Sequence, residues 1–108
     1  MEDKQEFLYT IKPTRLEMLS DGGTAAEQTI LSQHFSYLQE LTQQGTVVMA
    51  ARTLTTGPET FGIVIFYAQD EEQAQAIMAT DPAVAQGVMQ AELFPFRIAL
   101  MAHVAGGE

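Results

Sequence analysis

The chain contains no cysteine, and this absence removes several kinds of chemistry. Without thiols there is no disulfide framework, no thiolate nucleophile and no zinc site built on cysteine. The absence also fits a reducing compartment, and we expect a cytoplasmic protein. Long hydrophobic runs are missing too, because the longest, Ile63–Ala68, is far too short to cross a bilayer. The first six residues are charged, with three acidic side chains against one lysine, and have no apolar stretch behind them, so we expect no signal peptide.

Basic residues are scarce as well: five Lys and Arg stand against 14 Asp and Glu, for a net charge of −9. Such a surface repels phosphate backbones and anionic lipids, so we expect no nucleic-acid or membrane partner. The only histidines are His34 and His103, and no His-x-x-x-His spacing or glycine-rich phosphate loop occurs. We therefore expect neither a metal nor another cofactor.

Length and hydrophobic content indicate one domain. The 108 residues are 46% hydrophobic, which is enough to form a core. We expect a single domain over residues 1–108, with a long loop at 13–23 and a flexible tail at 104–108.

The hydrophobic periodicity and the turn residues predict an alternating order of strands and helices. Thr24 and Glu27 form a capping box at the start of the first helix, and Gly45 ends it. The expected elements are strands over 6–12, 46–53 and 61–68, helices over 24–44 and 71–79, a short helical turn over 81–87, and one or two strands over 91–96 and 97–103. This order is typical of a ferredoxin-like βαββαβ sandwich of the α+β class, with an antiparallel sheet and both helices on one face.

The strand over 61–68 is apolar on both of its sides. An antiparallel sheet with one face in water alternates between apolar and polar residues, and this strand does not. We therefore expect the open sheet face to form a homodimer.

His34 lies on the apolar side of the first helix, where a titratable ring needs a partner or a pocket. Three interpretations remain open: a buried ring bonded to a backbone carbonyl, an exposed ring, or a pocket residue with a chemical role. Asp81, in the turn Asp81-Pro82, is the candidate partner. Its alternative role is the N-cap of the following helical turn, and both roles are compatible because a carboxylate has two oxygens.

Two segments resemble the signatures of the YciI-like (YCII-related domain) family. His34–Leu41, followed by Gly45 and the strand 47–52, resembles the first, and Asp81–Met89, followed by Ala91–Phe96, resembles the second. The resemblance implies a dimeric α+β barrel of ferredoxin-like halves. It also implies a His–Asp pair proposed as an active site, which corresponds here to His34 and Asp81.

The family that the chain resembles is mostly uncharacterised, and some of its relatives act in aromatic degradation. The family includes a dehydrochlorinase of chlorinated hydroxyquinols, and muconolactone isomerase has a similar fold. This chain departs from many members at Leu31, where they carry arginine, and at Ala51, where they carry glycine. The long segment 13–23 resembles a longer-loop branch of the family.

The predicted site combines acid–base and binding residues. His34 would transfer a proton, and Asp81 would fix its tautomer. Arg52 and Arg15 are candidates to bind a carboxylate or phenolate, and Tyr9 and Tyr37 to line a pocket for a small anionic or aromatic ligand. Surface ion pairs for the arginines and core packing for the tyrosines are the alternatives.

Two functional hypotheses follow. The first is a small dimeric enzyme of the isomerase or lyase type that uses the His–Asp pair for proton transfer or elimination on a small organic molecule. It predicts a cavity of about 300 Å³ or more lined by His34 and at least one arginine. The second is a non-catalytic dimer that binds a ligand or a partner protein and has a structural His–Asp pair, with no room beside His34.

Overall fold

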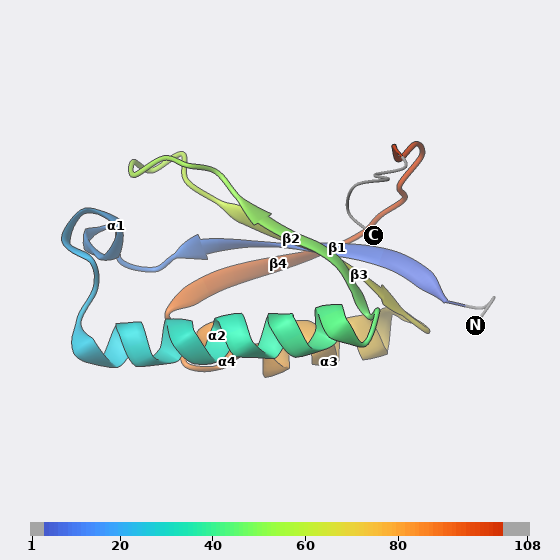
Figure 1. Ribbon diagram of the computed structural model, residues 1–108, viewed down its shortest axis with the longest axis horizontal. Coiled ribbons are helices and arrows are strands. Elements are labelled where there is room, and N and C mark those ends of the chain that lie inside the picture. The colour runs from blue at the N-terminus through green and yellow to red at the C-terminus, as the bar shows by residue number, and fades with distance from the viewer. Residues whose placement is uncertain (1–3, 103–108) are drawn as a thin grey trace.

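A four-stranded antiparallel sheet forms the frame of the computed structural model, which describes residues 4–102 (Figure 1). The strands are β1 (Gln5–Pro13), β2 (Val47–Arg52), β3 (Gly62–Ala68) and β4 (Met89–Pro95), and the helices are α1 (Glu17–Asp21), α2 (Ala25–Gln43), α3 (Glu71–Thr80) and α4 (Pro82–Ala85). The spatial order of the strands is β2-β3-β1-β4. This arrangement confirms the predicted ferredoxin-like α+β fold.

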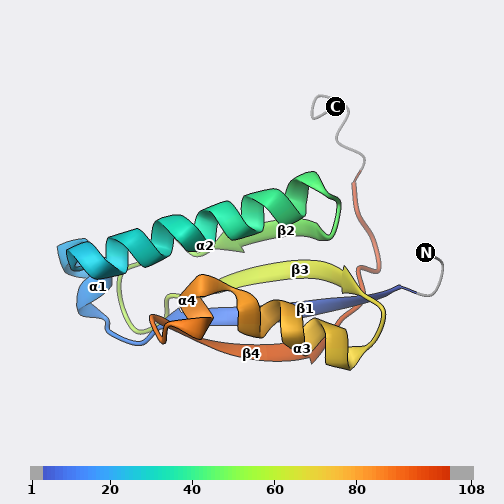
Figure 2. The same cartoon turned by 90° about the horizontal axis from the view of Figure 1, so that it is seen from below.

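Helices α2, α3 and α4 all lie on one face of the sheet (Figure 2). Alternate residues of β1 and β3 point toward these helices and are buried, because successive side chains of a strand point to opposite faces. The core between the sheet and the helices contains Phe7, Tyr9, Ile11, Leu38, Val47, Val64, Phe66, Ala68, Ala74 and Met78.

The predicted ends of α2 are confirmed. Thr24 Oγ1 accepts a hydrogen bond from Glu27 N, and the Glu27 side chain accepts one from Thr24 N, so the capping box is complete. After the helix, Gly45 has a φ of 82°, a left-handed conformation that favours glycine. The side of α2 that faces the sheet includes His34 and Leu38, as the apolar periodicity predicted.

Two segments differ from the sequence-based prediction. The long loop contains the short helix α1, because Met18 is buried and anchors the segment. No strand follows β4 within the described residues, so the strand expected over 97–103 is wrong for residues 97–102, and the rest of it lies outside them. After Pro95, Phe96 N still donates to the Glu6 carbonyl at 3.1 Å, and Ile98 N then donates to the Glu6 side chain at 2.7 Å rather than to a neighbouring strand.

One end of the sheet brings the functional segments together. Ile11 near the end of β1 pairs with Gly62 at the start of β3, and Gly62 pairs with Arg52 at the end of β2. Helix α1 and the start of α2 lie at the same end (Figures 1 and 2). Among the described residues, no helix combines the length and the apolar composition needed to cross a membrane.

Candidate active site

Asp81 lies at the junction of α3 and α4 and is fully buried. Three donors surround its carboxyl group. Oδ1 is 2.7 Å from His34 Nδ1 and accepts the N-capping bond of α4 from Ala83 N at 3.0 Å, while Oδ2 accepts from Tyr9 Oη at 2.7 Å. A buried carboxylate is costly without such partners, and this one has them from β1, α2 and α4.

The contact with Asp81 orients the His34 ring. Tyr9 and Ala83 use the carboxyl oxygens as acceptors, so the matching tautomer has the proton on Nδ1 and donates it to Oδ1. The other nitrogen, Nε2, then carries a lone pair when the ring is neutral. Nε2 makes no hydrogen bond within the described residues, and no buried side-chain nitrogen or oxygen there lacks a partner. Nε2 is therefore accessible from outside the core.

The two tyrosine hydroxyls beside this pair remain protonated at neutral pH. Burial raises the pKa of Tyr9, and the negative charge of Asp81 acts in the same direction. Burial also raises the pKa of Tyr37 to about 12, with a further contribution from Asp81. Tyr37 Oη donates to the Ile77 carbonyl at 2.7 Å and so ties α2 to α3.

A cavity of about 460 Å³ lies beside His34, at the end of the sheet where β1 ends and β3 begins. Its polar side chains are His34, Arg52 and Thr60, and most of its other walls are apolar. The full lining is Ile11, Pro13, Leu19, Leu31, His34, Phe35, Leu38, Ala50, Ala51, Arg52, Thr60, Phe61, Gly62, Ile63, Val64 and Met89. This volume and this mixture of an apolar wall with a few polar groups are typical of small-molecule sites.

Arg52 faces the cavity because of its register. It pairs with Gly62, which shares a sheet face with the buried core residue Val64, so Arg52 lies on the helix side of the sheet. Because Gly62 has no side chain, it leaves the space next to Arg52 and Ile11 open. A Cβ at this position would lie 3.0 Å from Ile11 Cγ1 and 3.2 Å from the Ala51 carbonyl oxygen. Arg52 makes no ion pair with a described residue, and its guanidinium is available to an anion.

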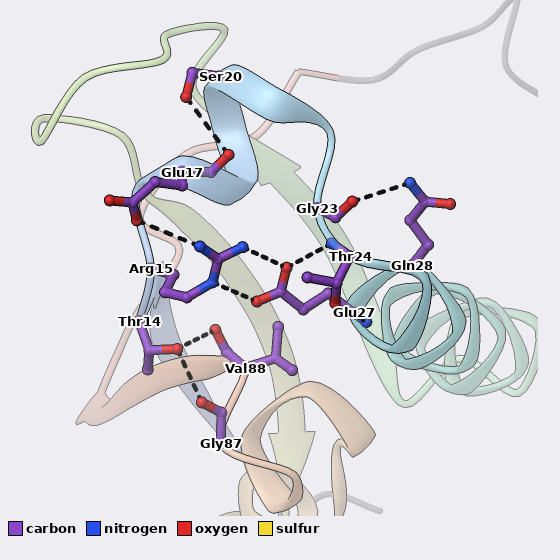
Figure 3. A network of polar contacts seen from close by, with 10 residues as sticks. All are labelled: Thr14, Arg15, Glu17, Ser20, Gly23, Thr24, Glu27, Gln28, Gly87 and Val88. Carbon is purple, nitrogen blue, oxygen red and sulfur yellow. Dashed lines mark hydrogen bonds and ion pairs between the residues drawn. The ribbon is translucent and has the colours of Figure 1, made fainter.

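Arg15, two residues before α1, is bonded to Glu27 near the start of α2 (Figure 3). The guanidinium donates to both carboxylate oxygens of Glu27, at 2.8 and 2.9 Å, and Glu17 lies 3.6 Å away. The hydrogen bonds from Arg15 and from Thr24 N hold the pKa of Glu27 at about 2. Leu19 of α1 lines the cavity, so the pair holds one of its walls.

The six predicted site residues occupy different places. His34 and Arg52 line the cavity, and Asp81 lies directly behind His34. Tyr9, Tyr37 and Arg15 are outside the lining, and their polar groups are bonded to Asp81, Ile77 and Glu27. The sequence missed Tyr9 as the third partner of the His–Asp pair, since only the strand register brings residue 9 beside residue 81. It also missed Thr60, whose sole sequence signal is a threonine-rich turn.

No group of three or more histidine, aspartate and glutamate side chains within residues 4–102 has a geometry that could hold a metal ion. His103 lies outside the described residues. The polar groups that converge on the cavity are an imidazole, a guanidinium and a hydroxyl. They are suited to proton transfer and to the binding of an anionic oxygen.

Solved structures with this fold include enzymes. The 5-chloro-2-hydroxyhydroquinone dehydrochlorinase TftG of Burkholderia phenoliruptrix AC1100, in complex with 2,5-dihydroxybenzoquinone, is similar with a TM-score of 0.64 and 18% identity, over 85% of this chain and 93% of that one. A proposed antibiotic biosynthesis monooxygenase of Bacteroides thetaiotaomicron has a TM-score of 0.51 and 14% identity, over 92% of each chain. At these identities the likeness concerns the fold.

Comparison with curated protein sequences finds no match. The sequence profile of the YCII-related domain, in contrast, matches residues 6–97, from the first strand to the residues after β4. This range includes His34, Asp81 and every residue that lines the cavity. The chain therefore belongs to the YCII-related domain family.

Proposed function

We propose that this protein is a small dimeric enzyme that catalyses proton transfer or elimination on a small organic molecule, with His34 as the acid–base residue. The observation that carries the proposal is the 2.7 Å contact of His34 Nδ1 with buried Asp81, beside a 460 Å³ cavity that His34 lines. The cavity exceeds the size that the enzyme hypothesis requires, and the partner of the ring is a carboxylate rather than the backbone.

In this mechanism Nε2 removes a proton from a carbon of the substrate. The electron pair released forms a carbon–carbon double bond as a halide leaves, or, in an isomerisation, as an adjacent double bond breaks and its far carbon takes up the proton. Asp81 keeps Nδ1 protonated and stabilises the positive charge that develops on the ring. Tyr9 and Ala83 N hold Asp81 in place, so the imidazole is oriented before the substrate arrives.

The cavity walls favour a planar apolar ring with an anionic group. Arg52 is the cation that the lining offers, and we propose that it binds a carboxylate, phenolate or enolate. Proteins with this fold include TftG, whose structure holds 2,5-dihydroxybenzoquinone, a compound of this chemical type. Its dehydrochlorination, the loss of HCl, is an elimination of the kind proposed here.

The experiment is a reaction screen in D₂O with chlorinated hydroxyquinols, lactones and cyclic ketones, followed by proton NMR and chloride release. The wild-type protein should exchange a carbon-bound proton or release chloride from at least one compound. His34→Gln should lower that rate about 100-fold or more and still bind the compound. Ser36→Ala, an exposed change on the same helix, is the matched control and should keep the wild-type rate.

Two results would overturn the assignment. Equal rates for His34→Gln and the wild type would remove His34 from the chemistry. Binding of several compounds without any exchange or release would favour the alternative, a ligand-binding dimer in which the pair is structural.

We also propose a homodimer through the open sheet face, the face away from the helices. Leu8 at its centre is flanked in register by Ile65 and Phe94, and Ile65 pairs with Met49 of β2. Phe94 and Met49 are 38% and 46% exposed, whereas Leu8 and Ile65 are 9% and 7% exposed, so the apolar area in water lies on the two edge strands of this face. A second copy would cover it. The cytoplasmic location stays a prediction from the sequence.

A further inference from the structure

Three threonine hydroxyls form a chain in the turn between β2 and β3. Thr53 Oγ1 lies 2.8 Å from Thr55 Oγ1, which lies 2.6 Å from Thr60 Oγ1. At the outer end Phe61 N donates to Thr53 Oγ1 at 3.2 Å. At the inner end Thr60 is 5% exposed and lines the cavity that contains His34 and Arg52. The row of hydrogen-bonded hydroxyls therefore connects a backbone donor, Phe61 N, to the cavity.

Counting the hydroxyl protons shows that the three threonines can donate to one another in two possible orders. Three hydroxyls carry three protons, and the two oxygen–oxygen contacts use two of them. If Thr53 donates to Thr55 and Thr55 donates to Thr60, the remaining proton belongs to Thr60, which lines the cavity. In the reverse order it belongs to Thr53, and Thr60 offers the cavity only an oxygen. An anionic oxygen in the cavity favours the first order, because it accepts the proton of Thr60.

Arg52 belongs to the same corner of the cavity. It ends β2 one residue before Thr53, and its strand partner Gly62 starts β3 two residues after Thr60. Thr53 N also donates to the Phe61 carbonyl at 2.9 Å, which closes the base of the turn. Guanidinium and hydroxyl groups thus come from the two sides of one turn, whereas His34 comes from α2.

We infer that this turn is the oxygen-binding subsite of the cavity, where Thr60 and Arg52 together hold an anionic phenolate or enolate oxygen of a planar ring. The inference rests on the proposed function, since it names the substrate class of the same cavity. The apolar ring would lie along Ile11 and Leu31, with His34 reaching a carbon from the helix side. Thr60 is then a specificity-determining residue, because a hydroxyl donor distinguishes an anionic oxygen from its methyl ether.

The test compares two probes that differ only in this oxygen, 4-nitrophenolate and 4-nitroanisole, by isothermal titration above the phenol's own titration range. The wild-type protein should bind the phenolate at least tenfold more tightly than the ether. Thr60→Val, which replaces the hydroxyl by a methyl group, should weaken phenolate binding about tenfold and leave ether binding unchanged. Thr60→Ser should restore the preference, and Thr80→Val, at an exposed threonine of α3, should not change it.

The outcomes separate this inference from the proposed function. A wild-type protein without preference for the phenolate, or a Thr60→Val variant that retains it, overturns the subsite even if His34→Gln abolishes the reaction. A loss of preference in Thr60→Val together with full activity of His34→Gln supports the subsite and contradicts the catalytic role. If Thr60→Val fails to fold, Thr60→Ala takes its place, because it removes the same hydroxyl and should reduce the preference.

Discussion

At the scale of single residues, Asp81 connects the fold and the site. Its carboxylate accepts bonds from a strand, a long helix and the first turn of a short helix, so three elements meet at one buried group. Removing one donor leaves part of a buried charge unsatisfied, which is costlier than the mean worth of a hydrogen bond. Residues that orient His34 should therefore also stabilise the fold.

Tyr9→Phe tests this link. The change removes the hydroxyl that donates to Asp81 Oδ2 and keeps the ring in the core. We predict that the free energy of unfolding falls by about 1–3 kcal/mol at pH 7, as measured by urea denaturation. Tyr67→Phe, on the open sheet face, is the matched control and should change stability by less than about 0.5 kcal/mol. Equal losses in both variants would contradict the account.

Alkaline pH tests the same tyrosine. Unfolded tyrosines ionise near pH 10, whereas the folded chain keeps the Tyr9 proton well beyond that pH and the Tyr37 proton up to about pH 12. The unfolded state then binds fewer protons, so stability falls as pH rises above 10, by about 1.4 kcal/mol per pH unit for Tyr9. In Tyr9→Phe the slope between pH 10 and 11.5 should be shallower by about one proton. An unchanged slope would contradict the burial argument.

The sequence predicted part of this site. Helical periodicity fixes the side of α2 on which His34 lies, and Asp81 before Pro82 is a local N-cap signal, so both could be found from neighbouring residues. Tyr9 reads as an ordinary strand residue, because its contact with Asp81 depends on the packing of β1 against the α3–α4 corner. Long-range register of this kind leaves no mark in a local pattern.

At the scale of elements, the segment around α1 is tied to α2 by the Arg15–Glu27 ion pair and by Gln28, whose side chain donates to the Gly22 carbonyl. Arg15 bonds both oxygens of Glu27, and Glu27 also caps α2, so the loop and the helix start share a carboxylate (Figure 3). The sequence identified the capping box, which is a spacing of three residues. It missed helix α1, since five residues are too few to give a periodicity.

The dependence of stability on acidic pH tests the Arg15–Glu27 ion pair. The Glu27 pKa is about 2 in the folded chain against 4.5 ordinarily, so its stabilising effect is present above pH 4.5 and is lost as pH falls toward 2. Glu27→Gln keeps the capping bond but loses the charge. It should be less stable than the wild type at pH 6, and the difference should shrink toward pH 2. Glu72→Gln, an exposed change on α3, is the control, and a difference independent of pH would contradict the prediction.

At the scale of the whole molecule, the sheet has helices on only one face, and we expect the other face to form a dimer. The helices cover one face (Figure 1), and Met49 and Phe94 on the edge strands of the other face are exposed. The alternation pattern of β3 identified this feature from the sequence. The strand expected after β4 was wrong within the described residues, where Ile98 N donates to the Glu6 side chain rather than to a neighbouring strand.

Phe94→Glu tests the proposed dimer. The variant would bury a charge opposite Leu8 between the two protomers, which is costly. In analytical ultracentrifugation the wild type should therefore sediment as a dimer and Phe94→Glu as a monomer. Gln39→Glu adds the same charge to the exposed side of α2 and should leave the assembly unchanged. A monomeric wild type, or a variant that still pairs, would contradict the proposal.

The most direct test of the central claim is the tautomer of His34, measured by nitrogen-15 NMR of its imidazole in a His103→Gln background. We predict that the neutral ring has its proton on Nδ1, toward Asp81, and an unprotonated Nε2 whose signal shifts when a ligand fills the cavity. Asp81→Asn should disturb this tautomer. A neutral ring protonated on Nε2, or a signal that no cavity ligand changes, would contradict the role of His34 as the acid–base residue.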